Sequence, residues 1–158
     1  MLGRVQISQN SKLRQGGAQV FKKILVPLDG SQLAEGILPR VEWLAKFHGA
    51  EVTLLRVALV HTFPGLDPVQ HQINVVREAE EYLAKIEANL KSVGVQVNSV
   101  VRYGNDAQEI VDHARDRGFD LIAMSTHGRT GITQFVLGSV ASKIIHTATV
   151  PILLCRVC

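Results

Sequence analysis

The chain has 158 residues, 46% of them hydrophobic, which is enough for one domain whose core needs neither disulfides nor a metal. Its net charge of +3 comes from the front of the chain, because residues 1–23 hold five basic residues and no acidic one. The rest keeps 12 of the 17 basic residues against 14 acidic ones, and aromatic residues are only 5% of the total. A nucleic-acid partner is therefore not expected, since it would need a basic face and aromatic side chains for base stacking.

Past the first twenty residues, short β-branched runs alternate with longer amphipathic stretches, which is typical of β-α units around a parallel sheet. The first strand is predicted at 23–28, where a nearly unbroken apolar run suits a central strand covered on both faces. After a turn at 29–31, a helix is expected over 34–48, with Gly49 as its stop. Pro39 falls inside this helix and should kink it at a cost of about 3 kcal/mol.

The remaining elements continue the alternation. The expected segments are a strand at 51–57, an irregular loop at 61–68, a helix at 73–90 stopped by Gly94, a strand at 95–102, a helix from 107 that ends at Gly118, a strand at 121–124, a helix at 140–148 and a strand at 150–155. This order predicts an α/β fold, an open, twisted, parallel five-stranded sheet in the order 3-2-1-4-5 with helices on both faces, as in Rossmann-like proteins.

The N-terminus has features of two kinds of segment. Its lack of acidic residues is typical of a transit peptide, but its glycine pair and few hydrophobic residues suit a disordered extension, which we favour. We therefore expect disorder over residues 1–20 and a single domain over 21–158. No run reaches the about 18 apolar residues of a membrane span, and no secretory signal is recognisable, so no membrane partner and a cytoplasmic location are expected.

Cys155 and Cys158 form a C-x-x-C pair at the end of the sequence. A redox pair of the thioredoxin type needs a following helix to lower the thiol pKa, and a zinc site needs two further ligands. The sequence provides neither. We interpret the pair as one thiol in a strand and one on the tail.

The segment from Ser125 to Val140, after the fourth predicted strand, has the chemistry of an anion-binding loop. Its glycines allow the backbone to approach a ligand closely, and Gly138-Ser139 begins a helix whose first N–H groups favour a phosphate. Ser139 is either the N-cap or a phosphate ligand, and Arg129 is the one cation in the loop. A plain glycine-rich turn is the alternative interpretation.

The predicted topology places a ligand where the winding of the sheet reverses, between strands one and four. Asp29 ends the first strand and the glycine loop follows the fourth, so that a hydrogen-bond acceptor for base or ribose faces a phosphate cradle. Asp29 is also a common turn former before a glycine such as Gly30, and this alternative stays open.

The chain from about Lys22 to Arg156 resembles the universal stress protein family. The ATP-binding branch of that family has a glycine, two residues, a second glycine, nine residues and then Gly-Ser or Gly-Thr. The same spacing is present here from Ser125 through Gly128 to Gly138-Ser139, with a serine at the first position, which fits if its φ is negative. The family pattern also matches the predicted first strand with Asp29 and the Val-Pro-Ile-Leu-Leu segment at 150–154.

The resemblance implies a fold like that of the adenine nucleotide alpha hydrolases, with ATP and Mg²⁺ as ligands. Pro27, Asp29 and the backbone of Val57 would hold adenine and ribose, and the glycine loop would hold ribose and phosphates. The complete set of expected nucleotide contacts is Pro27, Asp29, Val57, Met124, Ser125, His127, Gly128, Arg129, Gly138, Ser139 and Val140. The family also implies a homodimer through the last strand, whose apolar edge at 150–155 would otherwise be open to aggregation.

Enzyme motifs are not recognisable in the sequence. It lacks a Walker A motif, a G-x-S-x-G elbow, an acid-rich motif for two metals and the Ser-Gly-Gly-x-Asp-Ser loop of adenylating pyrophosphatases. His127 could act as a general base, but we favour a role in ordering the turn or contacting ribose. We interpret the protein as an ATP-binding regulator with at most slow hydrolysis. A nucleotide-free dimeric interaction protein is the alternative, although it would have no use for Gly128, Gly138 and Ser139.

Overall fold

The computed structural model describes residues 21–58, 67–126 and 137–156, and their strands form a single sheet. The strands are β1 (Lys23–Pro27), β2 (Glu51–Ala58), β3 (Val97–Tyr103), β4 (Leu121–Thr126) and β5 (Ile152–Arg156). Their order across the sheet is β3-β2-β1-β4-β5, and every pairing is parallel. The predicted sheet is therefore confirmed, whereas the predicted disordered extension at 1–20 lies outside the described residues.

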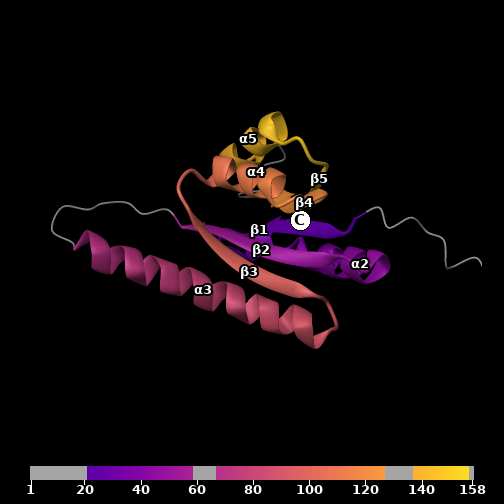
Figure 1. Cartoon of the computed structure of the whole chain (residues 1–158), viewed down its shortest axis with the longest axis horizontal. Helices are drawn as coiled ribbons and strands as arrows, with labels where there is room; N and C mark the ends of the chain where they lie inside the picture. The colour runs from indigo at the N-terminus through magenta and orange to yellow at the C-terminus, as the bar shows by residue number, and fades with distance from the viewer. Residues whose placement is uncertain (1–20, 59–66, 127–136, 157–158) are drawn as a thin grey trace, which may run out of the picture.

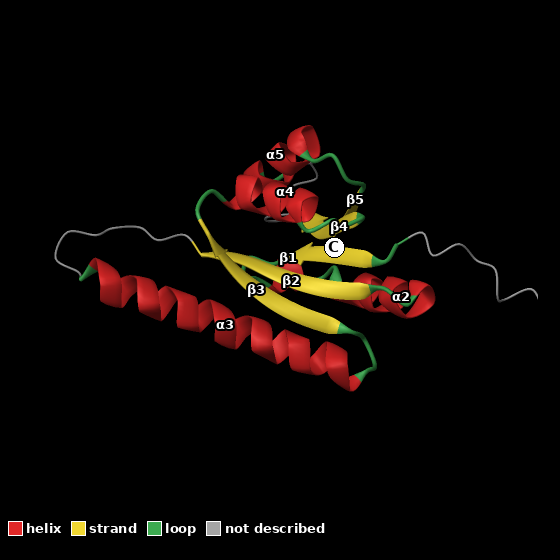
Figure 2. Cartoon of the chain, viewed as in Figure 1, coloured by secondary structure: helices red, strands yellow, loops and turns green. Residues whose placement is uncertain are grey.

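The helices form one layer on each face of the sheet (Figure 1). They are α1 (Gln32–Glu35), α2 (Leu38–His48), α3 (Pro68–Ser92), α4 (Asp106–Asp116) and α5 (Ser139–Thr147). Figure 2 shows α2 and α3 below the sheet and α4 and α5 above it, so the predicted two-sided arrangement is confirmed. Among the described helices, none combines the length and the apolarity that a membrane crossing requires.

β1 occupies the middle of the sheet and is buried on both faces. Ile24, Leu25 and Val26 are each 0% exposed. Because side chains of a strand alternate, Ile24 and Val26 join the core under α2 and α3, and Leu25 joins the core under α4 and α5. This double burial is the physical reason for the unbroken apolar run in the sequence.

The segment after β1 folds as two helices instead of one kinked helix. α1 ends at Glu35 and α2 begins at Leu38, so Pro39 lies in the first turn of α2. The first N–H groups of a helix have no partner within it, so the missing N–H of proline costs nothing at this position. The prediction that Pro39 kinks a helix is therefore wrong. α2 ends at His48, and Gly49 caps it as predicted, with φ at +65°.

α3 packs on the sheet only along its C-terminal part. Its first turns extend past the end of the sheet (Figure 1), and there Ile73, an expected apolar position of the helix, is 51% exposed. The later apolar positions are buried, namely Ala79, Leu83, Ile86 and Leu90. The helical period thus identified the correct face of α3 but not the point where the sheet begins to cover it.

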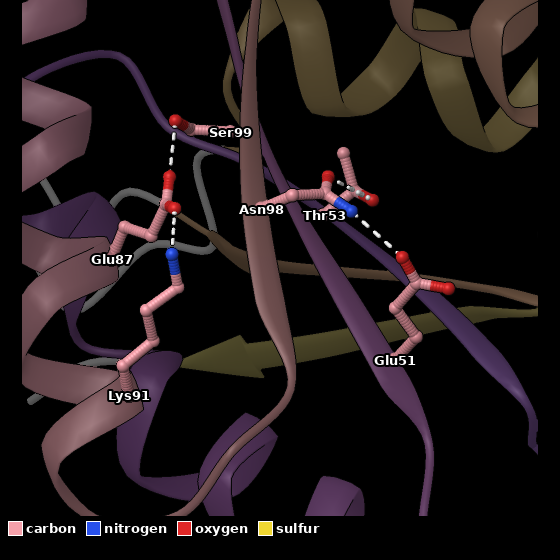
Figure 3. A network of polar contacts seen from close by, with 6 residues as sticks. All are labelled: Glu51, Thr53, Glu87, Lys91, Asn98 and Ser99. Atoms are coloured by element: carbon pink, nitrogen blue, oxygen red, sulfur yellow. Dashed lines mark hydrogen bonds and ion pairs between the residues drawn. The ribbon is translucent and has the colours of Figure 1, made fainter.

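A polar network connects β2, β3 and α3 (Figure 3). The Asn98 side chain of β3 donates to Glu51 of β2 over 2.7 Å and accepts a hydrogen bond from the Thr53 hydroxyl of β2 over 2.8 Å. Both contacts cross between neighbouring strands. They therefore support the β2–β3 register, in which Thr53 lies opposite Asn98.

Glu87 of α3 accepts hydrogen bonds from the Ser99 hydroxyl of β3 and from Lys91 one turn along the helix. These two donors, Lys91 first, hold the pKa of Glu87 below its usual value of 4.5. The carboxylate therefore stabilises the fold above that pH, and its contribution is lost as the pH falls through the lowered value. We expect Glu87→Gln to reduce the free energy of unfolding by about 1 kcal/mol at neutral pH.

The difference between Glu87→Gln and the wild type should shrink towards zero as the protein is acidified below the lowered pKa. Urea denaturation across the pH range measures it. Glu80→Gln, at an exposed position of the same helix, is the matched control. A loss for Glu87→Gln that is independent of pH would contradict the role of the charge.

Candidate functional site

A cleft of about 290 Å³ opens at the carboxyl ends of β1, β2 and β4. It is lined by Pro27, Leu28, Asp29, Ala34, Leu55, Arg56, Val57, Ala58, Val75, Ala79, Asp106, Ile110, Met124, Ser125, Val140 and Ala141. The position agrees with the rule that parallel α/β sheets bind ligands outside the carboxyl ends of strands, where the winding reverses. Here β1 lies between β2 and β4, so the reversal point is inside the cleft.

The structure brings six of the eleven predicted contact residues to this cleft. They are Pro27, Asp29, Val57, Met124, Ser125 and Val140. Gly138 and Ser139 are next to Val140 in the chain but do not line the cleft themselves. His127, Gly128 and Arg129 lie outside the described residues. The role of all eleven as nucleotide contacts stays a prediction.

Gly138 is the N-cap of α5, with φ −58° and ψ 151°. The interpretation of Ser139 as the N-cap is therefore wrong: Ser139 is the first residue of the helix, and the N-cap, a glycine, has no side chain that could cap it. The first hydrogen bond of the helix runs from Ser142 N to Gly138 O over 2.9 Å. The amides of Ser139, Val140 and Ala141 precede it, and together with the helix dipole they favour an anion.

Ser125 lies inside β4, which continues to Thr126, two residues past its predicted end. Its side chain is buried, and its hydroxyl donates to the Ala34 carbonyl oxygen over 3.3 Å. As a strand residue it has the extended backbone that serine adopts without strain. Serine thus fits at the position where the family pattern has a glycine, and it ties β4 to α1.

Asp29 forms the turn that the sequence suggested, and its role in nucleotide recognition stays a prediction. Its Oδ1 accepts a hydrogen bond from the Ser31 amide over 2.8 Å, which shapes the turn after β1. Ser31 in turn caps α1 by accepting from the Ala34 amide over 3.1 Å. The Asp29 residue is nevertheless exposed and lines the cleft. Asp29 therefore both shapes the turn and forms part of the cleft wall.

The wall contributed by α3 was not predicted. Arg56 of β2 lines the cleft, and its guanidinium lies 5.0 Å from the centre of the Tyr82 ring of α3, in cation–π geometry. Val75 and Ala79 of the same helix complete this side. The charge of Arg56 at an otherwise apolar strand end could have indicated that this residue belongs to a site. The α3 residues gave no such indication, because they belong to an ordinary amphipathic pattern.

The Tyr82 hydroxyl is buried and has no hydrogen-bond partner among the described residues. Burial, followed by the nearby carboxylates of Glu35 and Asp29, raises its pKa above the usual value of 10. Glu35 acts here as a neighbouring charge, without the geometry of a hydrogen bond. The Tyr82 side chain behind Arg56 is therefore neutral at neutral pH.

The described parts of the chain contain no group of three or more His, Cys, Asp or Glu residues arranged to hold a metal ion. Cys155 is a buried free thiol in β5, as predicted for the first cysteine. Cys158 lies outside the described residues.

Comparison with known proteins gives a consistent result. Residues 21–156 match the model of the universal stress protein family. Universal stress protein MJ0531 of Methanocaldococcus jannaschii is 34% identical, with 93% of this chain and 88% of the relative covered. The solved structure of MJ0577 from the same organism is 30% identical, with a TM-score of 0.77 and coverage of 88% of this chain and 98% of that one.

A universal stress protein from Archaeoglobus fulgidus, solved in complex with dAMP, shares the fold with a TM-score of 0.64. It is 21% identical, and the match covers 85% of this chain and 98% of that one. The family match spans the whole sheet and all described helices. The chain therefore belongs to the universal stress protein family.

Proposed function

We propose that this protein is a cytoplasmic regulator of a stress response that binds Mg-ATP, or a related adenine nucleotide, with little or no turnover. The observation that carries the proposal is the convergence of Asp29, Val57 and Val140 on one cleft beside the start of α5, whose N-cap is a glycine. The dAMP complex of the relative from Archaeoglobus fulgidus supports an adenine nucleotide as the ligand class.

The base and ribose would occupy the part of the cleft between β1 and β2. Pro27, Leu28 and Val57 give it apolar walls, which suit a purine ring. The backbone of Val57 offers hydrogen bonds to the base, and the Asp29 carboxylate accepts from the ribose or from an amino group. The volume of about 290 Å³ is close to the lower limit for small-ligand sites.

The phosphates would lie at the start of α5. The amides of Ser139, Val140 and Ala141 and the positive end of the helix dipole would hold them, and the Ser139 hydroxyl would donate a further hydrogen bond. Mg²⁺, bound to the phosphate oxygens, would neutralise part of their charge.

We also propose that the protein is a homodimer that pairs through β5, the open end of the sheet. Nucleotide binding would then favour one conformation of the dimer or of a partner surface. The alternative, a nucleotide-free dimer that acts only through its surface, makes no use of the cleft. The two functions therefore differ in whether a nucleotide stabilises the fold.

Thermal unfolding with and without millimolar Mg-ATP tests the proposal. A ligand at about 100 times its dissociation constant adds about 2.7 kcal/mol of stability, so the melting temperature should rise. Mass spectrometry of ligand released from the purified protein should identify an adenine nucleotide. An unchanged melting temperature and no released nucleotide would favour the nucleotide-free alternative.

Asp29→Asn separates the two roles of this residue. The asparagine oxygen can still accept from the Ser31 amide, so the turn and the melting temperature of the unliganded protein should be preserved. Loss of the carboxylate should weaken ATP binding by about ten- to a hundredfold, or about 1.5–3 kcal/mol. Calorimetric titration measures the affinity. Equal affinities together with a lower melting temperature would assign Asp29 to the turn alone.

A further inference from the structure

Asp106 of α4 lines the cleft, although it was not among the predicted nucleotide contacts. The charged residues of the cleft lining are Asp29, Arg56 and Asp106. The first two have contacts beside the cleft, since Asp29 accepts from the Ser31 amide and Arg56 lies over the Tyr82 ring. In an otherwise largely apolar pocket, a third charged group is a candidate for fixing the orientation of a ligand.

The start of α4 does not need the Asp106 side chain as a cap. The N-cap is Asn105, whose side chain accepts a hydrogen bond from the Gln108 amide over 3.3 Å. Asp106 is the first residue of the helix, and its Oδ1 accepts from the adjacent Ala107 amide over 2.8 Å. No partner of Oδ2 is found among the described residues. This half-buried carboxylate therefore keeps an oxygen that can accept a hydrogen bond from a ligand.

The path of the chain after β3 brings the start of α4 to the end of β2. The two strands pair as far as Ala58 opposite Tyr103. The chain then turns at Gly104, with φ +126°, and α4 begins at Asp106 and packs on both strands. The first residue of α4 therefore lies near the carboxyl end of β2, on the side of the cleft where we place the base.

Asp106 and Ile110 share one face of α4, because residues four apart lie one above the other on a helix. Both residues line the cleft, so this face of the helix meets the ligand space. Val57 of β2 lines the cleft as well and packs against the core to which Ile110 belongs. A base beside the Val57 backbone therefore lies on the same face of the sheet as Asp106.

The exocyclic group of a purine distinguishes what such a carboxylate can accept. Adenine carries an amino group with two N–H donors, of which the backbone of Val57 can accept only one in a single direction. An ionised carboxylate only accepts hydrogen bonds, so it suits the second N–H. Hypoxanthine has a keto oxygen at the same position. That oxygen would face the carboxylate with no hydrogen between them, which is unfavourable in a half-buried site.

We propose that Asp106 accepts a hydrogen bond from the exocyclic amino group of the bound base, and that it thereby selects adenine over purines with a keto group at that position. The inference rests on the proposed nucleotide function and deepens it. It assigns selection of the base to α4 and leaves the Asp29 carboxylate to the ribose.

Calorimetric titration of ATP and of inosine triphosphate into the full chain tests this assignment. The wild type should bind ATP at least about tenfold more tightly. The asparagine of Asp106→Asn can present either its oxygen or its amide N–H groups to the base. We therefore expect ATP to bind more weakly and inosine triphosphate more tightly, so that the preference falls about tenfold. A purely structural role of Asp106 would not move the two affinities in opposite directions.

Two further variants complete the experiment. Asp106→Ala removes both the acceptor and its repulsion of a keto oxygen, so it should lower the preference as well. Asp116→Asn changes an exposed carboxylate at the other end of α4, outside the cleft lining, and should keep the wild-type preference. Asn105 still caps α4 in all three variants, so the melting temperatures without ligand should stay close to that of the wild type.

The outcomes separate this inference from the proposed function. Equal changes in the two affinities on replacing Asp106 would assign its effect to charge repulsion or to the helix, which overturns the inference and leaves nucleotide binding intact. A wild type that binds both nucleotides equally well would overturn it too. Absence of binding by either nucleotide would overturn the proposed function together with this inference.

Discussion

Gly138→Val is expected to abolish the rise in melting temperature that the proposed binding of Mg-ATP would produce. Gly138 precedes α5 with φ −58° and ψ 151°, a conformation open to any L-residue, so valine should introduce no backbone strain. Its branched side chain would instead fill the space in front of the first amides of α5, where we place the phosphates. Loss of two charge-assisted hydrogen bonds there should weaken binding by about a hundredfold or more.

Ser139→Ala is the matched control for this substitution. The Ser139 side chain is exposed and makes no capping hydrogen bond, so its removal should leave the unliganded fold unchanged. If its hydroxyl contacts a phosphate, affinity should fall about tenfold, much less than for Gly138→Val. A Gly138→Val protein with the thermal shift of the wild type would remove the start of α5 from the site.

The sheet could be predicted because each strand carries its own local signal. β1 is buried on both faces and therefore reads as an unbroken apolar run, which placed it in the middle of the sheet before any tertiary contact was known. The end of α2 could also be predicted from a local signal, because Gly49 adopts φ +65°, a conformation that glycine tolerates best.

The features that were missed depend on tertiary context. Pro39 within an apolar periodic stretch fits a kinked helix or a helix start equally well, and only the separation of α1 from α2 decides between them. Ile73 continues the apolar face of α3, yet it is exposed because the helix extends past the sheet. The hydrophobic periodicity of a helix reveals neither the length of the sheet nor how far the helix extends past it.

The candidate site also has a part that the sequence predicted and a part that it did not. The contributions of β1 and β4 were predictable, because the carboxyl ends of parallel strands meet at one edge and Asp29 and Met124 lie at those ends. The wall formed by Arg56 with Val75 and Ala79 was not, since it depends on how α3 crosses the sheet. The cleft therefore combines strand ends that the sequence predicted with a wall from α3 that it did not.

The sheet edge at β5 offers a separate test of assembly. Ile152 is half-buried and lines a groove beside α2, and Leu154, two residues further along the strand, is 36% exposed. A lysine on an edge strand opposes pairing, because the charge would have to lose its water next to the symmetry-related strand. Each such substitution occurs twice in a two-fold dimer, so its cost in the free energy of dimer formation is counted twice.

If the proposed dimer forms, we expect Ile152→Lys to convert it into a monomer at micromolar concentration, as measured by light scattering. Since Ile152 also packs partly against the core under α4 and α5, circular dichroism must show a retained fold, and Leu154→Lys repeats the test at a more exposed position. Tyr103→Lys, at a 43% exposed site on β3 at the opposite edge of the sheet, is the control and should remain dimeric. A folded Leu154→Lys protein with the mass of the wild-type dimer would exclude β5 as the pairing strand, whereas loss of the dimer in Tyr103→Lys would move the interface to the β3 edge.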